Sequence, residues 1–248
     1  KAAILPFHMW APDVRQGVSM PVASFLAAAP GAAVLAVLMR VFLYGFERLS
    51  GHWVPALAVL AIATMVGGYL LALNQRNLKR MMAYIFLAQG GFALMGVAAA
   101  SPDGVVGAVF HICVYSLAAA GCYAILVMCR RPYEGETEIS DYAGLAQRHP
   151  AIALGFALLL LSLAGLPPAA GFSGRLMLMS AAAEAGLPML AAAAAGVLLL
   201  SAYVSSRLVV NIYMRPANPG TLKVKVSPEA MAVLALAASG TLVLGLFP

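Results

Sequence analysis

Three basic residues that can carry a charge or a proton stand in apolar stretches of the chain. Lys1 precedes an apolar run, His111 lies within the run 104–129, and Arg175 lies within the run 151–190. Away from water, desolvation favours the neutral form of a lysine, and a histidine exchanges its proton near neutral pH. An arginine keeps its charge, so it sets a field, holds water or compensates an acid. These residues are candidates for a proton path.

Each of the three also has a structural alternative. Lys1 is alternatively a lysine that reaches water from the end of a helix. His111 is alternatively a core histidine bonded to a backbone carbonyl, and Arg175 a counter-charge for carbonyls freed at 165–171. The polar side chains that would line a hydrated path beside them are Tyr115, Gln89, Ser173 and Glu184. Glu184 is either an exit-side proton acceptor or an exposed cap.

The element that must position Arg175 is interrupted. The run 151–190 would be roughly 60 Å long as one helix, about twice the hydrocarbon core of a bilayer. Prolines remove backbone donors and glycines loosen the rest, and the residues that predict this break are Gly165, Pro167, Pro168, Gly171 and Gly174. We therefore expect one membrane crossing made of two half-helices. Such a break survives in a membrane only where protein buries it or water reaches it.

The composition is that of an integral membrane protein. Of the 248 residues, 63% are hydrophobic and 10% are charged, and the mean hydropathy is +0.92. Long apolar runs without alternation predict helices, not a β-barrel. We expect an all-α, polytopic transmembrane helix bundle with discontinuous helices, forming a single transmembrane domain over 1–248. The net charge of +6 reports membrane topology and is no sign of nucleic-acid binding.

The apolar runs predict one half-span at 1–10, a polar turn at 11–17 and seven full crossings. The full crossings are 18–46, 53–73, 81–100, 104–129, 151–190, 187–214 and 229–247. Alternate loops then place ten basic residues on one side and Arg48 alone on the other, which puts the ten in the cytoplasm. The connection 130–150 becomes a cytoplasmic loop, and the last span ends outside. Because the chain opens with Lys1 and a half-span, we expect a fragment that lacks its N-terminal part.

No pattern for a metal or a cofactor is visible in the sequence. Cys113, Cys122 and Cys129 are spaced by nine and seven residues, so no C-x-x-C pair is available for iron–sulfur or zinc ligation. No G-x-G-x-x-G motif indicates a dinucleotide site. We expect the chain to hold no cofactor and no metal.

The order of several segments resembles NADH-quinone oxidoreductase subunit N, the antiporter-like membrane subunit family of respiratory complex I. The segments are Lys1-Ala-Ala-Ile-Leu-Pro-Phe-His-Met-Trp-Ala-Pro-Asp-Val14, Pro21-Val-Ala-Ser-Phe-Leu26, Asn77-Leu-Lys-Arg-Met-Met-Ala-Tyr84, Asp141-Tyr-Ala-Gly-Leu145 and Leu161 to Arg175. They extend in order over essentially the whole chain. Pro-Asp-Val followed by Pro21-Val favours subunit N over the larger antiporter-like subunits and the Mrp antiporters.

The resemblance implies a fold with two inverted five-helix repeats and a midplane proton path through lysines. Lys1 matches the first of these lysines. The eighth-helix lysine is replaced at Pro30-Gly31, the twelfth-helix lysine by Arg175, and a frequent tenth-helix histidine by Gln89. A glycine carries no proton, and an arginine keeps its charge but does not titrate.

The resemblance further implies a subunit of NADH:quinone oxidoreductase, a translocase, that contributes proton translocation and has no redox centre of its own. NADH, flavin, iron–sulfur clusters and quinone would lie elsewhere in the complex. The implied partners are other complex I membrane subunits, the lipid bilayer, protons and internal water, and the implied location is the bacterial cytoplasmic membrane. Two alternatives stay open. One is a non-conducting structural subunit, and the other is a subunit of a Mrp-type antiporter or a membrane-bound hydrogenase.

Overall fold

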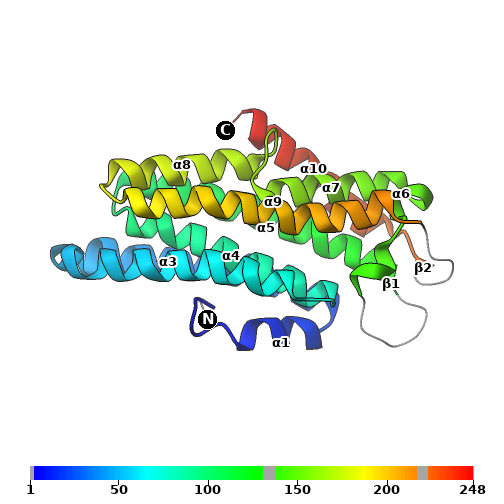
Figure 1. The fold of residues 1–248 in the computed structure, drawn as a ribbon, viewed down its shortest axis with the longest axis horizontal. Coiled ribbons are helices and arrows are strands. Elements are labelled where there is room, and N and C mark those ends of the chain that lie inside the picture. The colour runs from blue at the N-terminus through cyan, green and yellow to red at the C-terminus, as the bar shows by residue number, and fades with distance from the viewer. Residues whose placement is uncertain (1–2, 131–137, 217–222, 248) are drawn as a thin grey trace.

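The computed structural model describes residues 3–130, 138–216 and 223–247, and its long helices run side by side along one axis (Figure 1). The elements in chain order are α1 (Trp10–Gly17), α2 (Met20–Met39), a π-helical turn η1 (Arg40–Gly45), a 3-10 turn η2 (Glu47–Leu49), α3 (Ser50–Leu73), α4 (Leu78–Ala98), α5 (Pro102–Met128), β1 (Cys129–Arg130), a 3-10 turn η3 (Ile139–Tyr142), α6 (Leu145–Arg148), α7 (Pro150–Ala164), α8 (Ala170–Glu184), α9 (Pro188–Met214), β2 (Lys223–Val224) and α10 (Pro228–Leu246).

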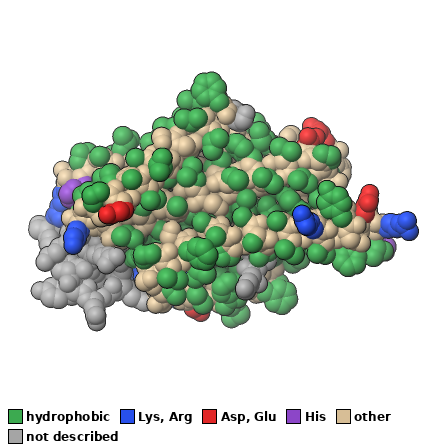
Figure 2. Space-filling view, turned by 180° about the vertical axis from the view of Figure 1, so that it is seen from behind, with side chains coloured by type: hydrophobic (Ala, Val, Ile, Leu, Met, Phe, Trp, Pro, Cys, Tyr) green, Lys and Arg blue, Asp and Glu red, His purple; other side chains and the backbone are tan. Residues whose placement is uncertain are grey.

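The predicted all-α membrane fold is confirmed. Across the described ranges, six helical segments are long and apolar enough to cross a membrane: Met20–Gly45, Glu47–Leu73, Leu78–Ala98, Pro102–Met128, Pro188–Met214 and Pro228–Leu246. They agree with the predicted spans to within a few residues. Hydrophobic side chains cover the middle of the face seen in Figure 2, and most charged side chains lie towards its ends. This distribution suits a bundle whose long axis crosses a bilayer.

The predicted break in the run 151–190 is present and is shorter than expected. α7 and α8 have 15 residues each, about 22 Å of helix, so neither spans a bilayer core of about 30 Å alone. They lie end to end, and the 27-residue helix α9 runs alongside both (Figure 1). The unwound segment covers only 165–169, so Gly171 and Gly174, which were predicted to belong to it, are helical. The reason is packing: both glycines lie where α8 meets neighbouring elements closely.

The beginning of the chain differs from the prediction. The expected half-span at 1–10 is not helical over residues 3–9, and the expected polar turn at 11–17 is helix α1 instead. Pro6 lacks a backbone donor and its ring would clash within a helix at 3–9. Pro12 falls in the first turn of α1, where an N–H has no partner anyway, and Asp13 complements the positive helix end.

Helix α4 is the centre of the bundle. Its most apolar window is 94% buried, against 22% each for α2 and α10, which leaves those two helices at the periphery. α3 and α4 approach closely because glycines face the partner helix. A Cβ on Gly68 would come 2.9 Å from the Ala88 backbone, and one on Gly91 would come 2.8 Å from the Met65 backbone. Small residues at such contacts are typical of membrane helix pairs.

The loops with most of the basic residues meet at one end of the bundle. The Arg80 guanidinium donates to Gln16 Oε1 at 3.1 Å, Ile139 N donates to Arg76 O at 3.0 Å, and Lys225 N donates to Met128 O at 2.8 Å. β1 and β2 pair antiparallel at the same end (Figure 1). The loop before α7 and the loop after α9 both lie at this end, as expected if α7 and α8 together form one crossing. Of the predicted loop 130–150, residues 131–137 lie outside the described part.

Candidate functional site at the helix break

The Arg175 side chain is fully buried and reaches back from α8 to the end of α7. Its Nη1 donates to Ala164 O at 2.6 Å, and its Nη2 donates to Leu163 O at 2.5 Å. The last carbonyls of a helix have no partner within the helix and form the negative end of its dipole. The guanidinium therefore caps the end of α7. The freed carbonyls are those of residues 163 and 164, slightly before the stretch 165–171 that the structural alternative named.

Three polar side chains from other helices complete the contacts of the guanidinium. Nη2 lies 2.8 Å from the Tyr69 hydroxyl (α3) and 3.4 Å from Gln89 Oε1 (α4), and Nη1 lies 2.9 Å from Ser201 Oγ (α9). The partners also bond to the break: Gln89 Nε2 and the Tyr69 hydroxyl donate to the carbonyl of Leu163, and Ser201 donates to that of Ala164. We refer to Arg175, Tyr69, Gln89 and Ser201 as the Arg175 cluster.

The cluster holds a permanent positive charge without a carboxylate. The ion pair between Arg80 and Asp13, at 2.9 Å, does not involve Arg175, and none of the hydrogen bonds found for the guanidinium in the described part of the chain goes to an acidic residue. A buried charge is costly unless polar groups surround it, and here carbonyl dipoles, a hydroxyl pair and an amide do so. Because a guanidinium does not lose its proton in proteins, Arg175 acts as a fixed charge and does not relay protons.

Phe92 lies between the Arg175 cluster and His111. The guanidinium carbon of Arg175 is 4.3 Å from the centroid of the Phe92 ring, and the His111 ring centroid is 5.7 Å from it. His111 is 2% exposed, and neither ring nitrogen has a hydrogen-bond partner among the described residues. His111 is therefore a core histidine, as the structural alternative states, and a hydrogen bond from its ring to a backbone carbonyl is not among those found in the described part of the chain. Buried unpartnered polar atoms are typical of sites that bind internal water.

Two glycines make the break possible. Gly165 has φ +73°, a conformation that residues with a Cβ avoid, and a Cβ there would lie 2.7 Å from Nη1 of Arg175. A Cβ on Gly171 would lie 1.8 Å from Ser162 O. The Gly171 N–H donates to Ser162 Oγ at 3.2 Å. The start of α8 is thereby held against the last turn of α7, with the Pro167–Pro168 bond cis between them.

The remaining path candidates lie away from the cluster. Tyr115 donates to Ala27 O in α2, near Pro30 and Gly31. Ser173 Oγ lies 3.4 Å from Gly245 O and joins α8 to α10. Glu184 is exposed at the last residue of α8. Lys1 lies outside the described residues.

The arrangement of the helices matches that of known membrane proteins. The family model described as NADH:quinone oxidoreductase/Mrp antiporter, TM matches residues 1–201. The chain belongs to this family. It superposes on a chain of respiratory complex I from Thermus thermophilus with a TM-score of 0.85 and 33% sequence identity, covering 100% of this chain and 54% of that one.

Curated relatives in the NADH:quinone oxidoreductase/Mrp antiporter family carry the name that the sequence motifs indicated. NADH-quinone oxidoreductase subunit N 2 of Rhizobium meliloti is 40% identical over 249 residues, covering 100% of this chain and 51% of that protein. Subunit N 3 of Streptomyces griseus is 37% identical and is covered to 45% of its length. The resemblance to subunit N is confirmed, and the chain spans about half the length of these curated relatives.

Within this antiporter-like fold, sequence reasoning identified Arg175 and Gln89 and missed three contacts. Tyr69, Phe92 and Ser201 were not among the candidates. The hydroxyls of Tyr69 and Ser201 lie inside apolar spans, which is a signal of polar contacts between helices, and Phe92 gives no such signal. No spacing in the sequence connects α3, α4 and α9 to one point. Only the packing of the helices shows that their side chains meet at Arg175.

Proposed function

We propose that the chain is part of an antiporter-like membrane subunit of NADH:quinone oxidoreductase and contributes to proton translocation coupled to electron transfer. Membership of the family supports this role, as do the relatives named subunit N. The observation that carries the proposal is a fully buried, fixed charge at a helix break with an unpartnered imidazole beyond one aromatic ring. Discontinuous helices with buried ionisable residues are the coupling elements of many ion-coupled transporters.

The proposed chemistry divides two roles between Arg175 and His111. Arg175 sets a constant positive field at the end of α7, and the cluster prevents the charge from moving. His111 is the group that gains and loses a proton, through internal water that binds its free ring nitrogens. Lys1, which matches the first lysine of the family path, would deliver protons from the other half of the subunit.

The assembly and placement of the subunit are part of the same proposal. Its partners are other membrane subunits of the complex, and NADH, flavin, iron–sulfur clusters and quinone are held by those or by soluble subunits. The basic loops lie in the cytoplasm of a bacterium and the end of α10 lies outside, as the excess of basic residues on one side indicates.

The function is tested by the proton-to-electron ratio of the full complex in proteoliposomes. His111→Phe keeps the size of a ring and removes both nitrogens, and we expect a lower ratio with NADH oxidation retained. Tyr203→Phe is the matched control, because Tyr203 is 62% exposed on α9 and is not part of the Arg175 cluster. A ratio equal to wild type in His111→Phe would remove the histidine from the path.

A second candidate function is a structural subunit that no longer conducts. The replacement of a family lysine by Gly31 and the non-titrating Arg175 favour it. If it applies, His111→Phe and Arg175→Gln both leave the ratio unchanged while the assembly of the complex depends on the cluster. The ratio therefore separates the two functions.

A further inference from the structure

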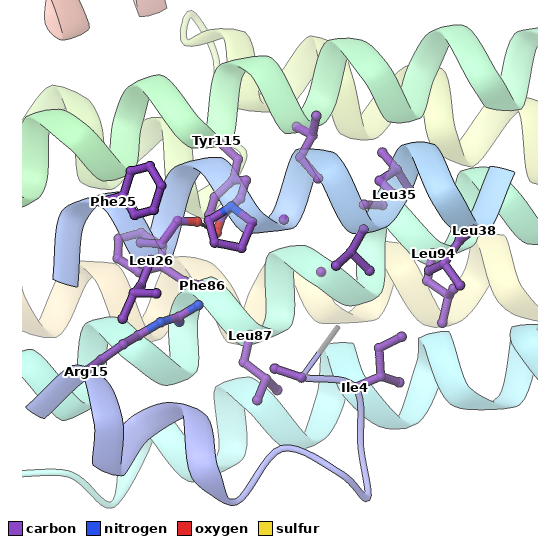
Figure 3. Close-up of a pocket in the computed structure, with 18 of the residues that line it drawn as sticks. Ile4, Arg15, Phe25, Leu26, Leu35, Leu38, Phe86, Leu87, Leu94 and Tyr115 are labelled. Carbon is purple, nitrogen blue, oxygen red and sulfur yellow. Dashed lines mark hydrogen bonds between the residues drawn. The ribbon is translucent and has the colours of Figure 1, made fainter. Parts of the chain in front are cut away.

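A cavity of about 350 Å³ lies among α1, α2, α4, α5 and residues 3–4. None of the four cluster residues lines it. Its walls are mostly apolar, and the residues that form them include Leu26, Gly31, Leu35, Phe86, Leu87 and Leu94 (Figure 3). Apolar cavities of this kind take up hydrocarbon more readily than water. The volume is near the lower end of the range for small-molecule sites, about 300–1,000 Å³.

Among the described residues, one buried cation faces this cavity. Arg15 is 8% exposed and extends from α1 towards Leu26 and Phe86 (Figure 3). Its Nη1 donates to Ala83 O at 3.1 Å, and in the described ranges the guanidinium has no other hydrogen bond and no ion pair. The nearby carboxylate of Asp13 pairs with Arg80 instead. A buried guanidinium has five donors, so most of them are available to an anion in the cavity.

The position of Arg15 gives the cavity a polar end and an apolar end. Ala83 lies five residues into α4, about 7.5 Å from its start, which is near the membrane surface if the helix crosses a bilayer. The part of α4 that lines the cavity runs from Phe86 to Leu94, about 12 Å of helix, and Leu94 lies about 16 Å along α4 from Ala83, which accepts the hydrogen bond from Arg15. That length is about half of a hydrocarbon core of ~30 Å, the depth of one leaflet. The dimensions and the charge suit a single acyl chain with an anionic head.

We propose that this cavity binds one long-chain fatty acid. The carboxylate accepts hydrogen bonds from Arg15, and the acyl chain lies between α2 and α4. Gly31 leaves room for the chain, because a Cβ there would have its nearest neighbour, Tyr115 Cε1, at 3.7 Å. A phospholipid with two chains is too large for the volume. Arg175 and His111, which the tests of the proposed function change, do not line this cavity, whereas the path-lining candidate Tyr115 does.

The test uses palmitate with a photoreactive group on its chain, added to the complex that contains the full-length subunit. We expect crosslinks on α2 and α4 that excess unlabelled palmitate removes. Arg15→Gln should weaken palmitate binding about tenfold or more, the range of a charged hydrogen-bonded pair. Arg80→Gln is the matched control, because it removes a neighbouring guanidinium that faces Asp13 and not the cavity. Gly31→Leu should abolish crosslinking by filling the space, whereas Gly196→Leu on an open helix face should not.

Three further probes distinguish a fatty acid from a neutral lipid, a phospholipid and a free phosphate as the ligand of the cavity. Hexadecanol carries the same chain with a neutral head and should bind about tenfold more weakly than palmitate. Phosphatidylglycerol and inorganic phosphate should not compete. Equal palmitate binding by wild type and Arg15→Gln would overturn the proposal, as would crosslinks confined to other helices or competition by phosphatidylglycerol alone. No crosslink on the full-length subunit would also overturn it.

Discussion

At the scale of single residues, the site depends on how one charge is surrounded. The guanidinium of Arg175 meets two main-chain carbonyls and three side chains, each from a different helix. Hydrogen bonds to a charged group contribute about 1.5–3 kcal/mol each, and an unmet buried donor costs about as much. The loss of one partner is therefore felt by the whole cluster.

We predict that Tyr69→Phe destabilises the subunit by about 1–3 kcal/mol, because it leaves one Arg175 donor and one Gln89 donor without the acceptor they share. The measurement is the midpoint of thermal denaturation of the purified complex. Tyr203→Phe removes an exposed hydroxyl and should leave the midpoint unchanged. Equal midpoints for both variants would show that the Tyr69 hydroxyl does not support the cluster.

The sequence identified the charge at this site but not the groups around it. Arg175 and Gln89 are predictable from the sequence because they are polar residues in apolar runs. Tyr69 and Ser201 are also polar, but many hydroxyls occur in these helices, and the phase of each helix decides which of them face inward. That phase depends on packing against neighbours that the sequence does not place.

At the scale of elements, the contact between α7 and α8 decides the shape of the break. The prolines and Gly165 predicted where the helix stops. They did not predict that it restarts at Ala170, because Gly171 and Gly174 have a low intrinsic helix propensity. Tertiary packing overrides that propensity, since only a glycine fits beside the carbonyl of Ser162. The same holds for α1, whose polar residues predict a turn although they form a helix that packs against α4.

We predict that Gly171→Ala destabilises the protein by about 3 kcal/mol or more, because the new methyl group overlaps a backbone oxygen at 1.8 Å that a side-chain rotation does not remove. Gly196→Ala is the matched change in α9, where no atom lies within 4 Å, and it should be neutral or stabilise by at most about 1 kcal/mol. Thermal denaturation of the two variants gives the comparison. Similar midpoints would mean that α8 does not approach α7 this closely.

At the scale of the whole molecule, α7 and α8 lie end to end and together have the length of one crossing, which predicts that the loops on either side of the pair lie on opposite faces of the membrane. The positive-inside count favours this arrangement, since a hairpin at 151–190 would move Arg215, Lys223 and Lys225 to the other side and weaken the excess of basic residues. The overall order of spans was predictable because each long apolar run has few ways to avoid water. The cavity beside Gly31 was not predictable, because it depends on how α1 packs against α2 and α4.

We predict opposite labelling of cysteines placed at Arg148 and at Glu184, the first before α7 and the second at the end of α8. In intact cells, a membrane-impermeant maleimide should label Glu184→Cys and leave Arg148→Cys unlabelled until the membrane is opened. Cys113, which is exposed, and the buried Cys122 and Cys129 are replaced by serine or alanine beforehand. Labelling of both positions from the same side would require a hairpin in place of a single crossing.

The central claim is that the charge of Arg175, held by the end of α7, is required for proton translocation. The most direct measurement is the proton-to-electron ratio of the assembled complex in proteoliposomes, with Arg175→Gln compared with Arg175→Lys. We expect a lower ratio in Arg175→Gln, which removes the charge, and a partial recovery in Arg175→Lys, which restores it without the two-pronged contact to the carbonyls. A wild-type ratio in Arg175→Gln, with normal assembly and NADH oxidation, would contradict the account.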